Sequence, residues 1–456
     1  MFCQNENGYT ATKNEYNKEI MDFGQGYKIF LDNAKTEREA TDYSVDILKK
    51  CGFKEFDGTT PLKSGDKIYK INRGKNVYAA IIGTLPMTEG INLLAAHIDS
   101  PRLDLKQNPL YEDSEFAMLR THYYGGIKKY QWTTIPLALH GVVMRGDGTK
   151  LEVKIGEDDS DPIFTISDLL PHLVKTDKKM SEVIIGENMT VIAGSVPSDS
   201  EKDKAKSAVL DLLKEKYNIT DEDFISAELT LVPAFKARDV GFDRSIVAAY
   251  GQDDRVCAYT ALMALCHMEK VEKTSVVILA DKEEIGSMGT TGMMSRFFED
   301  TTALICSLTD DNYTDITLRT CFANSTCLSA DVGAAMDPNY KEVQEASNAP
   351  KFNHGLMLTK YTGARGKSGS SDADAELVSK IRNIFNENGV AWQIGELGKV
   401  DQGGGGTVAQ FIANLNIETI DCGVPLLSMH SPFETASKFD VYMAYKGYKA
   451  FMENCR

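Results

Sequence analysis

The sequence predicts a mixed α/β protein: a two-sided, largely parallel sheet with a β-rich domain inserted into it. After residue 245, apolar runs alternate with helical patterns, which is typical of strand–helix repeats around a parallel sheet. The segment 106–240 lacks that alternation and carries short strand-like runs instead. The chain has 456 residues, a length that favours two domains over one.

The first hundred residues are expected to begin with helix and continue with strands. Apolar residues recur at three- and four-residue spacings between 15 and 52, and Cys51-Gly52 closes that segment. Short apolar runs at 68–71, 77–82 and 91–96 are bounded by Gly, Pro or Asn and predict strands. We assign these elements to one domain made of residues 1–105 and 241–456.

The insert, residues 106–240, is predicted to be mostly β. Strand patterns occur at 137–144, 151–155 and 227–233, and a polar helix rich in Lys, Asp and Glu is expected at 198–217.

The C-terminal half is predicted to alternate between strands and helices. We expect helices at 254–268, 288–298, 373–388, 407–415 and from about 438, and strands at 275–280, 302–307, 327–330, 391–394 and 418–422. Ligands of such sheets usually bind at the carboxyl ends of the strands.

Composition narrows the range of partners and compartments. Lys plus Arg is 50 and Asp plus Glu is 66, so the net charge is −16, which argues against a general nucleic-acid binder and against anionic membranes. Nine cysteines without a Cys-x-x-Cys pair indicate a reducing compartment. No basic start followed by an apolar run is present, and the apolar runs are too short to span a bilayer. A cytoplasmic location is the expectation.

Histidines and acids lie near the ends of several predicted elements. His97 and Asp99 are two apart, so they face the same side of an extended chain. That spacing suits a metal-binding histidine whose ring is oriented by a carboxylate. It is also compatible with a solvated turn.

Two pairs of adjacent acids can be interpreted either as parts of a metal site or as ordinary structural features. Asp253-Asp254 opens a helix, where acids ordinarily complement the helix dipole. Glu283-Glu284 follows an apolar strand, and neighbouring carboxylates there can divide metal binding and proton transfer between them. A surface loop is the alternative for the second pair.

Asp331 and His430 each follow an apolar stretch, and taken singly each is only weak evidence for a metal ligand. Jointly, two histidines and several carboxylates near element ends of one α/β domain suit two divalent metals with nitrogen and oxygen ligands.

A family resemblance rests on these residues together with longer motifs. The motifs are Tyr124-Gly-Gly126, Ile135-Pro-Leu-Ala-Leu-His140, Asp281–Gly286, Asp337-Pro-Asn-Tyr340 and Asp421-Cys-Gly-Val-Pro-Leu-Leu-Ser-Met-His-Ser431. Over nearly its whole length the chain resembles the aspartyl aminopeptidase/aminopeptidase I family of co-catalytic zinc metallopeptidases. The resemblance implies a two-sided α/β metallopeptidase domain with an inserted β-rich dimerisation or lid domain.

The resemblance also implies a ligand set for two Zn²⁺ per subunit, with Mn²⁺ or Co²⁺ as other plausible ions. It places His97 and Asp331 on one ion, Glu284 and His430 on the other, and Asp253 between them. Asp253 is preferred to Asp254 because the family's bridging acid is followed by Asn or Asp.

The remaining implied roles concern proton transfer, orientation and substrate. Glu283 would be the general base, and Asp99 would orient His97. His140 matches a family histidine that reaches a neighbouring subunit's active site, and Lys360 matches a family lysine near the substrate side chain. The resemblance also implies hydrolysis of the N-terminal residue from peptides with a free amine, inside a tetrahedral homododecamer built from dimers.

Two departures from the family pattern leave the preferred N-terminal residue open. The segment Asp331–Pro338 lacks the usual histidines, and the stretch that follows Lys360 lacks the usual Asn- and Gln-containing run. Acidic and neutral residues such as Leu therefore both remain possible. Two other function classes also stay open: a carboxypeptidase or deacylase on the same metal site, and a non-catalytic shell protein.

Overall fold

The computed structural model describes residues 2–174 and 178–456 and divides the chain into two compact units. The larger unit comprises the residues up to Asp99, Ala237–Met429 and Phe433–Arg456, and the smaller unit comprises Ser100–Lys236 and His430–Pro432. Within the described residues, no helix combines the length and the hydropathy that a bilayer span requires.

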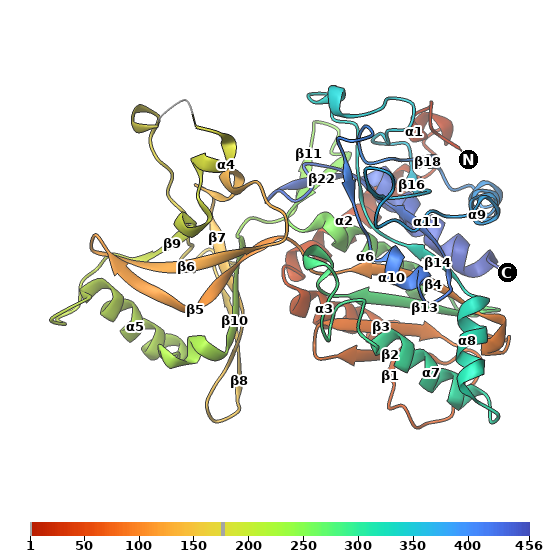
Figure 1. The fold of residues 1–456 in the computed structure, drawn as a ribbon, viewed down its shortest axis with the longest axis horizontal. Helices are drawn as coiled ribbons and strands as arrows, with labels where there is room; N and C mark the ends of the chain where they lie inside the picture. Colours follow the sequence, from red (N-terminus) through yellow and green to blue (C-terminus); the bar gives the residue numbers. More distant parts are fainter. Residues whose placement is uncertain (1, 175–177) are drawn as a thin grey trace. The chain divides into compact units, whose positions relative to one another are not determined.

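A nine-stranded sheet forms the centre of the larger unit (Figure 1). Its strands, in spatial order, are β1 (Lys54–Glu55), β2 (Lys67–Asn72), β3 (Asn76–Ile81), β13 (Thr274–Ala280), β4 (Ile91–His97), β14 (Thr326–Ser329), β20 (Glu418–Gly423), β16 (Leu356–Thr359) and β18 (Trp392–Ile394). The pairs β1–β2, β13–β4, β4–β14, β14–β20 and β16–β18 are parallel, and the other three are antiparallel. The predicted mixed α/β fold is therefore confirmed.

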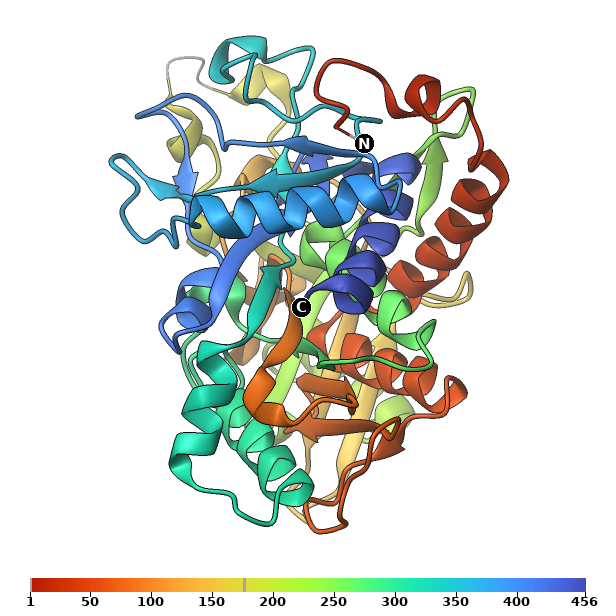
Figure 2. The same cartoon turned by 90° about the vertical axis from the view of Figure 1, so that its right-hand side faces the viewer.

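The sheet buries both of its faces. Alternate residues of β4 point to opposite sides, so Leu94 and Ala96 join one apolar cluster while Leu93 and Ala95 join another. The first cluster includes α2 (Asn17–Asn33), α3 (Glu37–Lys50), α6 (Gln252–Cys266), α9 (Ala375–Glu387) and α11 (Lys438–Asn454). The second includes α7 (Phe297–Thr309), α8 (Asp315–Ala323) and α10 (Ala409–Ala413). Figure 2 shows α11, in dark blue, beside the red α2.

Three adjacent parallel strands bring their carboxyl ends to one edge of this sheet. β4 ends at His97, which pairs with Ala280 at the end of β13. On the other side of β4, Ser329 at the end of β14 pairs with Ala95. Residues that follow these strands therefore lie close together, where parallel sheets usually bind ligands.

The region 288–309 differs from its prediction. The expected helix at 288–298 is wrong, because 286–296 form turns, and the expected strand at 302–307 lies inside α7. A Cβ added at Gly292 would lie 2.1 Å from the Ser287 carbonyl oxygen, so the chain there follows a tight path that a helix does not provide. α7 buries Phe298, Thr302 and Ile305, at helical rather than strand spacing.

A five-stranded sheet of the larger unit flanks the start of α6. Its order is β11 (Arg238–Val240), β12 (Ile246–Ala249), β22 (Glu434–Ser437), β21 (Pro425–Leu427) and β15 (Gly333–Ala334). β12 leads into α6 at Gln252, and β22 begins at Glu434.

The smaller unit contains a six-stranded antiparallel sheet. Its order is β8 (Lys150–Ile155), β7 (Leu137–Met144), β10 (Ala227–Pro233), β5 (Arg102–Asp113), β6 (Phe116–Tyr124) and β9 (Thr190–Gly194). The polar helix α5 (Lys204–Tyr217) packs against β5 and β6 and starts six residues later than the predicted 198 (Figure 1).

Candidate metal centre

His97 lies at the end of β4, buried, with both ring nitrogens next to acids. Its Nδ1 lies 3.3 Å from Asp99 Oδ1 and 3.1 Å from the Asp99 carbonyl oxygen. Its Nε2 lies 3.2 Å from Asp253 Oδ1 and 3.9 Å from Glu283 Oε2. With Nδ1 turned toward Asp99, Nε2 is the nitrogen that a metal ion would use.

The Asp99 carboxylate also holds the turn that carries the adjacent glutamates. Its two oxygens accept the backbone N–H groups of Glu283 and Glu284, each at 3.1 Å. This turn, Glu283–Ile285, is a single 3-10 segment after β13. Asp99 therefore fixes the histidine ring and both glutamates with one fully buried side chain.

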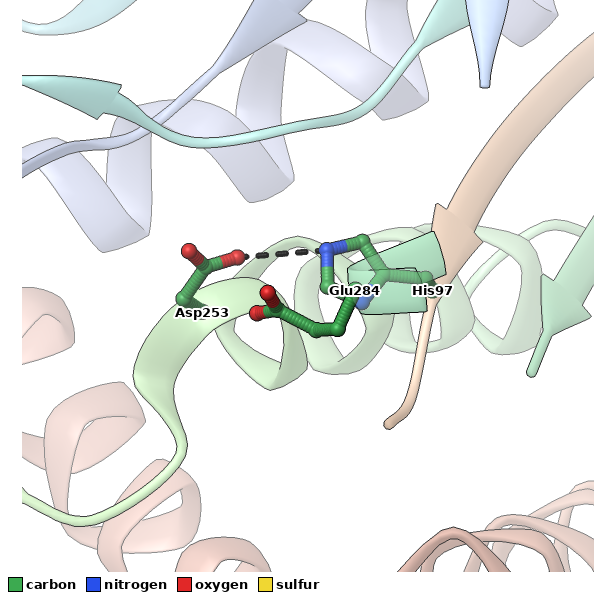
Figure 3. Close-up of side chains that lie close together, drawn as sticks. All are labelled: His97, Asp253 and Glu284. Atoms are coloured by element: carbon green, nitrogen blue, oxygen red, sulfur yellow. Dashed lines mark ion pairs between the residues drawn. The ribbon is translucent and has the colours of Figure 1, made fainter. Parts of the chain in front are cut away.

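Asp253 and Glu284 face His97 from two other segments. Figure 3 shows the three side chains pointing toward one another, with the ion pair between Asp253 and His97 dashed. One potential ligand atom from each of the three lies within 4.8 Å of the others, as a metal site requires. The peptide bond between Asp253 and Asp254 is cis.

A second group on the same histidine contains Asp254 and Asp331. Their ligand atoms and one of His97 also lie within 4.8 Å of one another, and all three residues are buried. Asp254 Oδ2 accepts the His97 backbone N–H at 3.3 Å. Asp254 Oδ1 is buried without a hydrogen-bond partner in the described part of the chain. The family resemblance favours Asp253 over Asp254 as a ligand, whereas the structure places Asp254 among the possible ligands as well.

The electrostatics of this cluster favour a cation. Burial raises the pKa of Asp254 well above its usual value, and burial together with the charge of Asp254 does the same to the pKa of Asp331. Burial lowers the pKa of His97, but hydrogen bonds to Asp253 and Asp99 outweigh it and raise that pKa well above normal. Crowded, buried carboxylates with an unsatisfied oxygen fit divalent metal ions, which favour the ionised form of their ligands.

Glu434, which no sequence pattern singles out, fixes the backbone of Asp253. Its Oε2 accepts the Asp253 N–H at 3.1 Å, and its carbonyl oxygen accepts from Gln252 Nε2 at 2.6 Å. The Gln252 side chain accepts in turn from the Tyr27 hydroxyl at 3.1 Å. A single Glu without another acid or histidine at a regular spacing does not indicate a site in the sequence, so only the fold reveals this contact.

Three other predicted site residues have local partners of their own. His140 in the smaller unit is fully buried, with Nε2 3.1 Å from Glu157 Oε1. His430 belongs to the same unit, where its Nδ1 lies 2.8 Å from the Gly126 carbonyl oxygen. Lys360 in the larger unit pairs with Asp372 at 2.7 Å. The roles assigned to these three residues stay predictions.

Comparison with known proteins identifies the family. The model of the aminopeptidase I zinc metalloprotease family (M18) matches residues 30–452. A probable M18 family aminopeptidase 1 from Clostridium acetobutylicum is 52% identical over 446 residues, covering 96% of each chain. A relative of the same description from Thermotoga maritima is 49% identical, again over 96% of each chain.

Solved structures agree with the fold. The crystal structure of an M18 aminopeptidase from Thermotoga maritima superimposes with a TM-score of 0.95 at 47% identity, covering 98% of this chain and 99% of that one. Aminopeptidase I from Clostridium acetobutylicum gives 0.91 at 48% identity, with the same coverage. A dodecamer of mApe1 from S. cerevisiae, 23% identical with a TM-score of 0.77, shares the fold. The chain therefore belongs to the M18 family of metal-dependent aminopeptidases, which hydrolyse peptides at the N-terminal residue.

Proposed function

We propose that this aminopeptidase works with two zinc ions held at the edge of the nine-stranded sheet. His97 and Asp331 would hold one ion, Glu284 and His430 the other, and Asp253 would lie between the two. The observation that carries the proposal is the cluster around His97, in which potential ligand atoms of Asp253, Glu284 and Asp331 each lie within 4.8 Å of a ring nitrogen of His97. When bound, such ions polarise the scissile carbonyl and make water acidic enough to lose a proton near neutral pH.

The chain's own residues would then move the proton. Glu283 follows β13 beside a proposed ligand, and its side chain is 18% exposed. It would take a proton from the attacking water and return it to the leaving amine. Asp99 would keep this base at a fixed distance from His97, because it holds the Glu283 backbone.

The substrate would be a peptide with a free N-terminal amine, and its first residue would be acidic or neutral. Lys360 and His140 are proposed to contact it. The Lys360–Asp372 pair is almost half-exposed on both sides, and exposed ion pairs contribute little free energy. Lys360 can therefore exchange Asp372, which also pairs with Lys367 at 2.8 Å, for a substrate carboxylate at small cost. An acidic first residue would use that exchange, whereas a neutral one would leave the Lys360–Asp372 pair in place.

A metal-restoration experiment tests the proposal. Chelator-treated protein is expected to lose activity on Asp-, Glu- and Leu-fluorogenic substrates and to recover it with Zn²⁺, Mn²⁺ or Co²⁺, whereas peptides with a blocked amine stay uncleaved. Full activity after verified metal removal would contradict the metal role. Cleavage of N-blocked substrates would indicate a deacylase or carboxypeptidase instead, and metal-loaded protein without any hydrolysis would indicate a shell protein.

Self-association is proposed from the smaller unit's surface. Large apolar side chains between 163 and 196 are unusually exposed: Ile163, Leu169, Leu170, Leu173, Val174, Met180, Val183, Ile185 and Val196. Many exposed large apolar side chains in one stretch of the described chain are typical of an interaction surface. We infer that it is covered by further copies of the chain in a tetrahedral homododecamer, the assembly that the family resemblance implies.

Leu173→Glu should therefore reduce the molecular mass measured by light scattering to that of a dimer or monomer, because a buried charge would disrupt the contact. Leu173 is 65% exposed in the single chain, so the fold of the subunit should survive. Leu212→Glu, on the polar helix α5 and 49% exposed, is the matched control and should leave the mass unchanged. An unaltered mass for Leu173→Glu would reject this surface as the interface.

A cytoplasmic location is proposed because the cysteines are present as thiols rather than disulfides. No cysteine of the described chain forms a disulfide, and eight of the nine are buried, as is usual for proteins of a reducing compartment.

A further inference from the structure

Arg255 occupies the first turn of α6, directly after the two aspartates of the metal centre, and is only 1% exposed. Burying an ionised guanidinium is costly unless its N–H groups are hydrogen-bonded. Its Nε donates to the Ile98 carbonyl oxygen at 3.2 Å, and one Nη donates to the Lys35 carbonyl oxygen at 3.0 Å. The guanidinium carbon lies 5.4 Å from the ring centroid of Tyr250. Three segments therefore meet at this side chain.

The Ile98 peptide is the link between Arg255 and the metal centre. Ile98 stands between His97 and Asp99, and its N–H donates to the Ala280 carbonyl oxygen at 2.9 Å. Its carbonyl oxygen accepts from Arg255. The backbone between His97 and Asp99 is thus fixed on one side by β13 and on the other side by α6.

This fixation sets where both neighbouring side chains point. A rotation of the Ile98 peptide would turn Asp99, which contacts His97 Nδ1 and holds the N–H groups of Glu283 and Glu284. Arg255 also follows Asp253 by two residues at the kinked start of α6, and the Asp253 carboxylate lies 3.2 Å from His97 Nε2. One side chain therefore joins the segment that carries Asp253 to the segment that carries His97.

We propose that Arg255 is a positioning residue of the metal centre, which holds the His97–Asp99 segment against the start of α6 through the Ile98 carbonyl. The inference rests on the proposed metal function of these residues. Arg255 touches neither substrate nor metal in this role. It acts through the directions of His97 and Asp99.

The planar fork of arginine is essential to this role. Its two acceptors belong to different segments, and a guanidinium reaches both with separate N–H groups held in one plane. A lysine keeps the charge but has one compact ammonium group, so it is expected to satisfy one carbonyl at most. Arg255→Lys therefore separates positioning from charge.

The test measures metal binding directly in the full-length protein. Zinc affinity is determined by competition with a chromophoric chelator, and the visible spectrum is recorded after replacement of zinc by Co²⁺, since that spectrum reports ligand geometry. Arg255→Lys should weaken zinc binding roughly 10–100-fold, the range for residues that orient metal ligands, and should alter the cobalt bands. Leu262→Ala, a fully buried cavity variant farther along α6, controls for lost stability and should leave both readouts near wild type.

Wild-type zinc affinity and an unchanged cobalt spectrum in folded Arg255→Lys would overturn the inference, as would equal losses in Leu262→Ala. If Arg255→Lys does not fold, Tyr250→Leu decides, because it removes the aromatic ring whose centroid lies 5.4 Å from the Arg255 guanidinium carbon: a several-fold loss of zinc affinity supports positioning, and an unchanged zinc affinity overturns it. Failure of the metal centre itself is distinguishable, because Glu284→Ala would then bind metal like the wild type.

Discussion

Glu283→Gln is expected to keep its metal ions and to lose roughly 10²–10⁴-fold in kcat, the usual contribution of a general base. The amide has nearly the volume of the carboxylate but cannot take a proton from water. The backbone contact to Asp99 uses the Glu283 N–H and is unaffected by the change. The measurement is kcat on an aminoacyl-fluorogenic substrate, together with the metal content by elemental analysis.

Glu299→Gln provides the matched control for this change. Glu299 lies on α7 and pairs with Arg296 at 3.2 Å, away from the cluster around His97, so kcat should stay within about twofold of wild type, as for ordinary surface substitutions. A wild-type kcat in Glu283→Gln would show that another group takes the proton. A loss of metal in the same variant would show that Glu283 is a ligand.

Asp253→Ala is expected to bind neither ion tightly, whereas Glu284→Ala should retain one. The proposal places Asp253 between the ions, so its loss removes a ligand from both, and the carboxylates left behind repel one another in a buried site. Glu284 would serve one ion alone. Metal per subunit after equilibrium dialysis distinguishes the three states, and activity should be abolished in Asp253→Ala.

Asp254→Asn separates the two adjacent acids. Asp254 lies with His97 and Asp331 in the second potential ligand group, although the family resemblance gives the bridging role to Asp253. If Asp253 bridges, Asp254→Asn retains both ions with weakened affinity, since the amide still accepts the His97 N–H. Complete metal loss in Asp254→Asn, with tight binding in Asp253→Ala, would reverse the assignment.

The sequence predicted the central parallel strands β4, β13, β14 and β20 because those strands are almost entirely buried, but it missed the parallel strands β1 and β16. β4 and β13 are continuous apolar runs that end in polar residues, a pattern typical of strands in the middle of a parallel sheet. The run at 302–307 is equally apolar but belongs to α7, and a short apolar run by itself does not distinguish a buried strand from a buried helix. The spacing that distinguishes the helix, Phe298 to Thr302 to Ile305, becomes visible only when the residues before 302 are included.

The site was predictable to the extent that its residues follow strands. His97, Asp99, Glu283 and Glu284 all lie at or just after the ends of β4 and β13, so register alone brings them together. Glu434 and Arg255 act through backbone groups of residues 181 and 157 positions away. A side chain that bonds to a main-chain atom does not require any particular residue type at the other position, so no pattern of residue types reveals these contacts.

The hydrogen bonds between the Asp99 carboxylate and the Glu283–Glu284 backbone couple metal retention to turnover in this enzyme. The two carboxylate oxygens of Asp99 accept hydrogen bonds from consecutive peptide groups, so the proposed proton acceptor Glu283 and the proposed ligand Glu284 are fixed on the same short segment. Heat, truncation or an inserted residue that loosens that piece would remove turnover and cation retention in a single event. Variants that keep metal binding without turnover, or the reverse, should arise only from substitutions that change the side-chain carboxylates and leave the backbone of this segment intact.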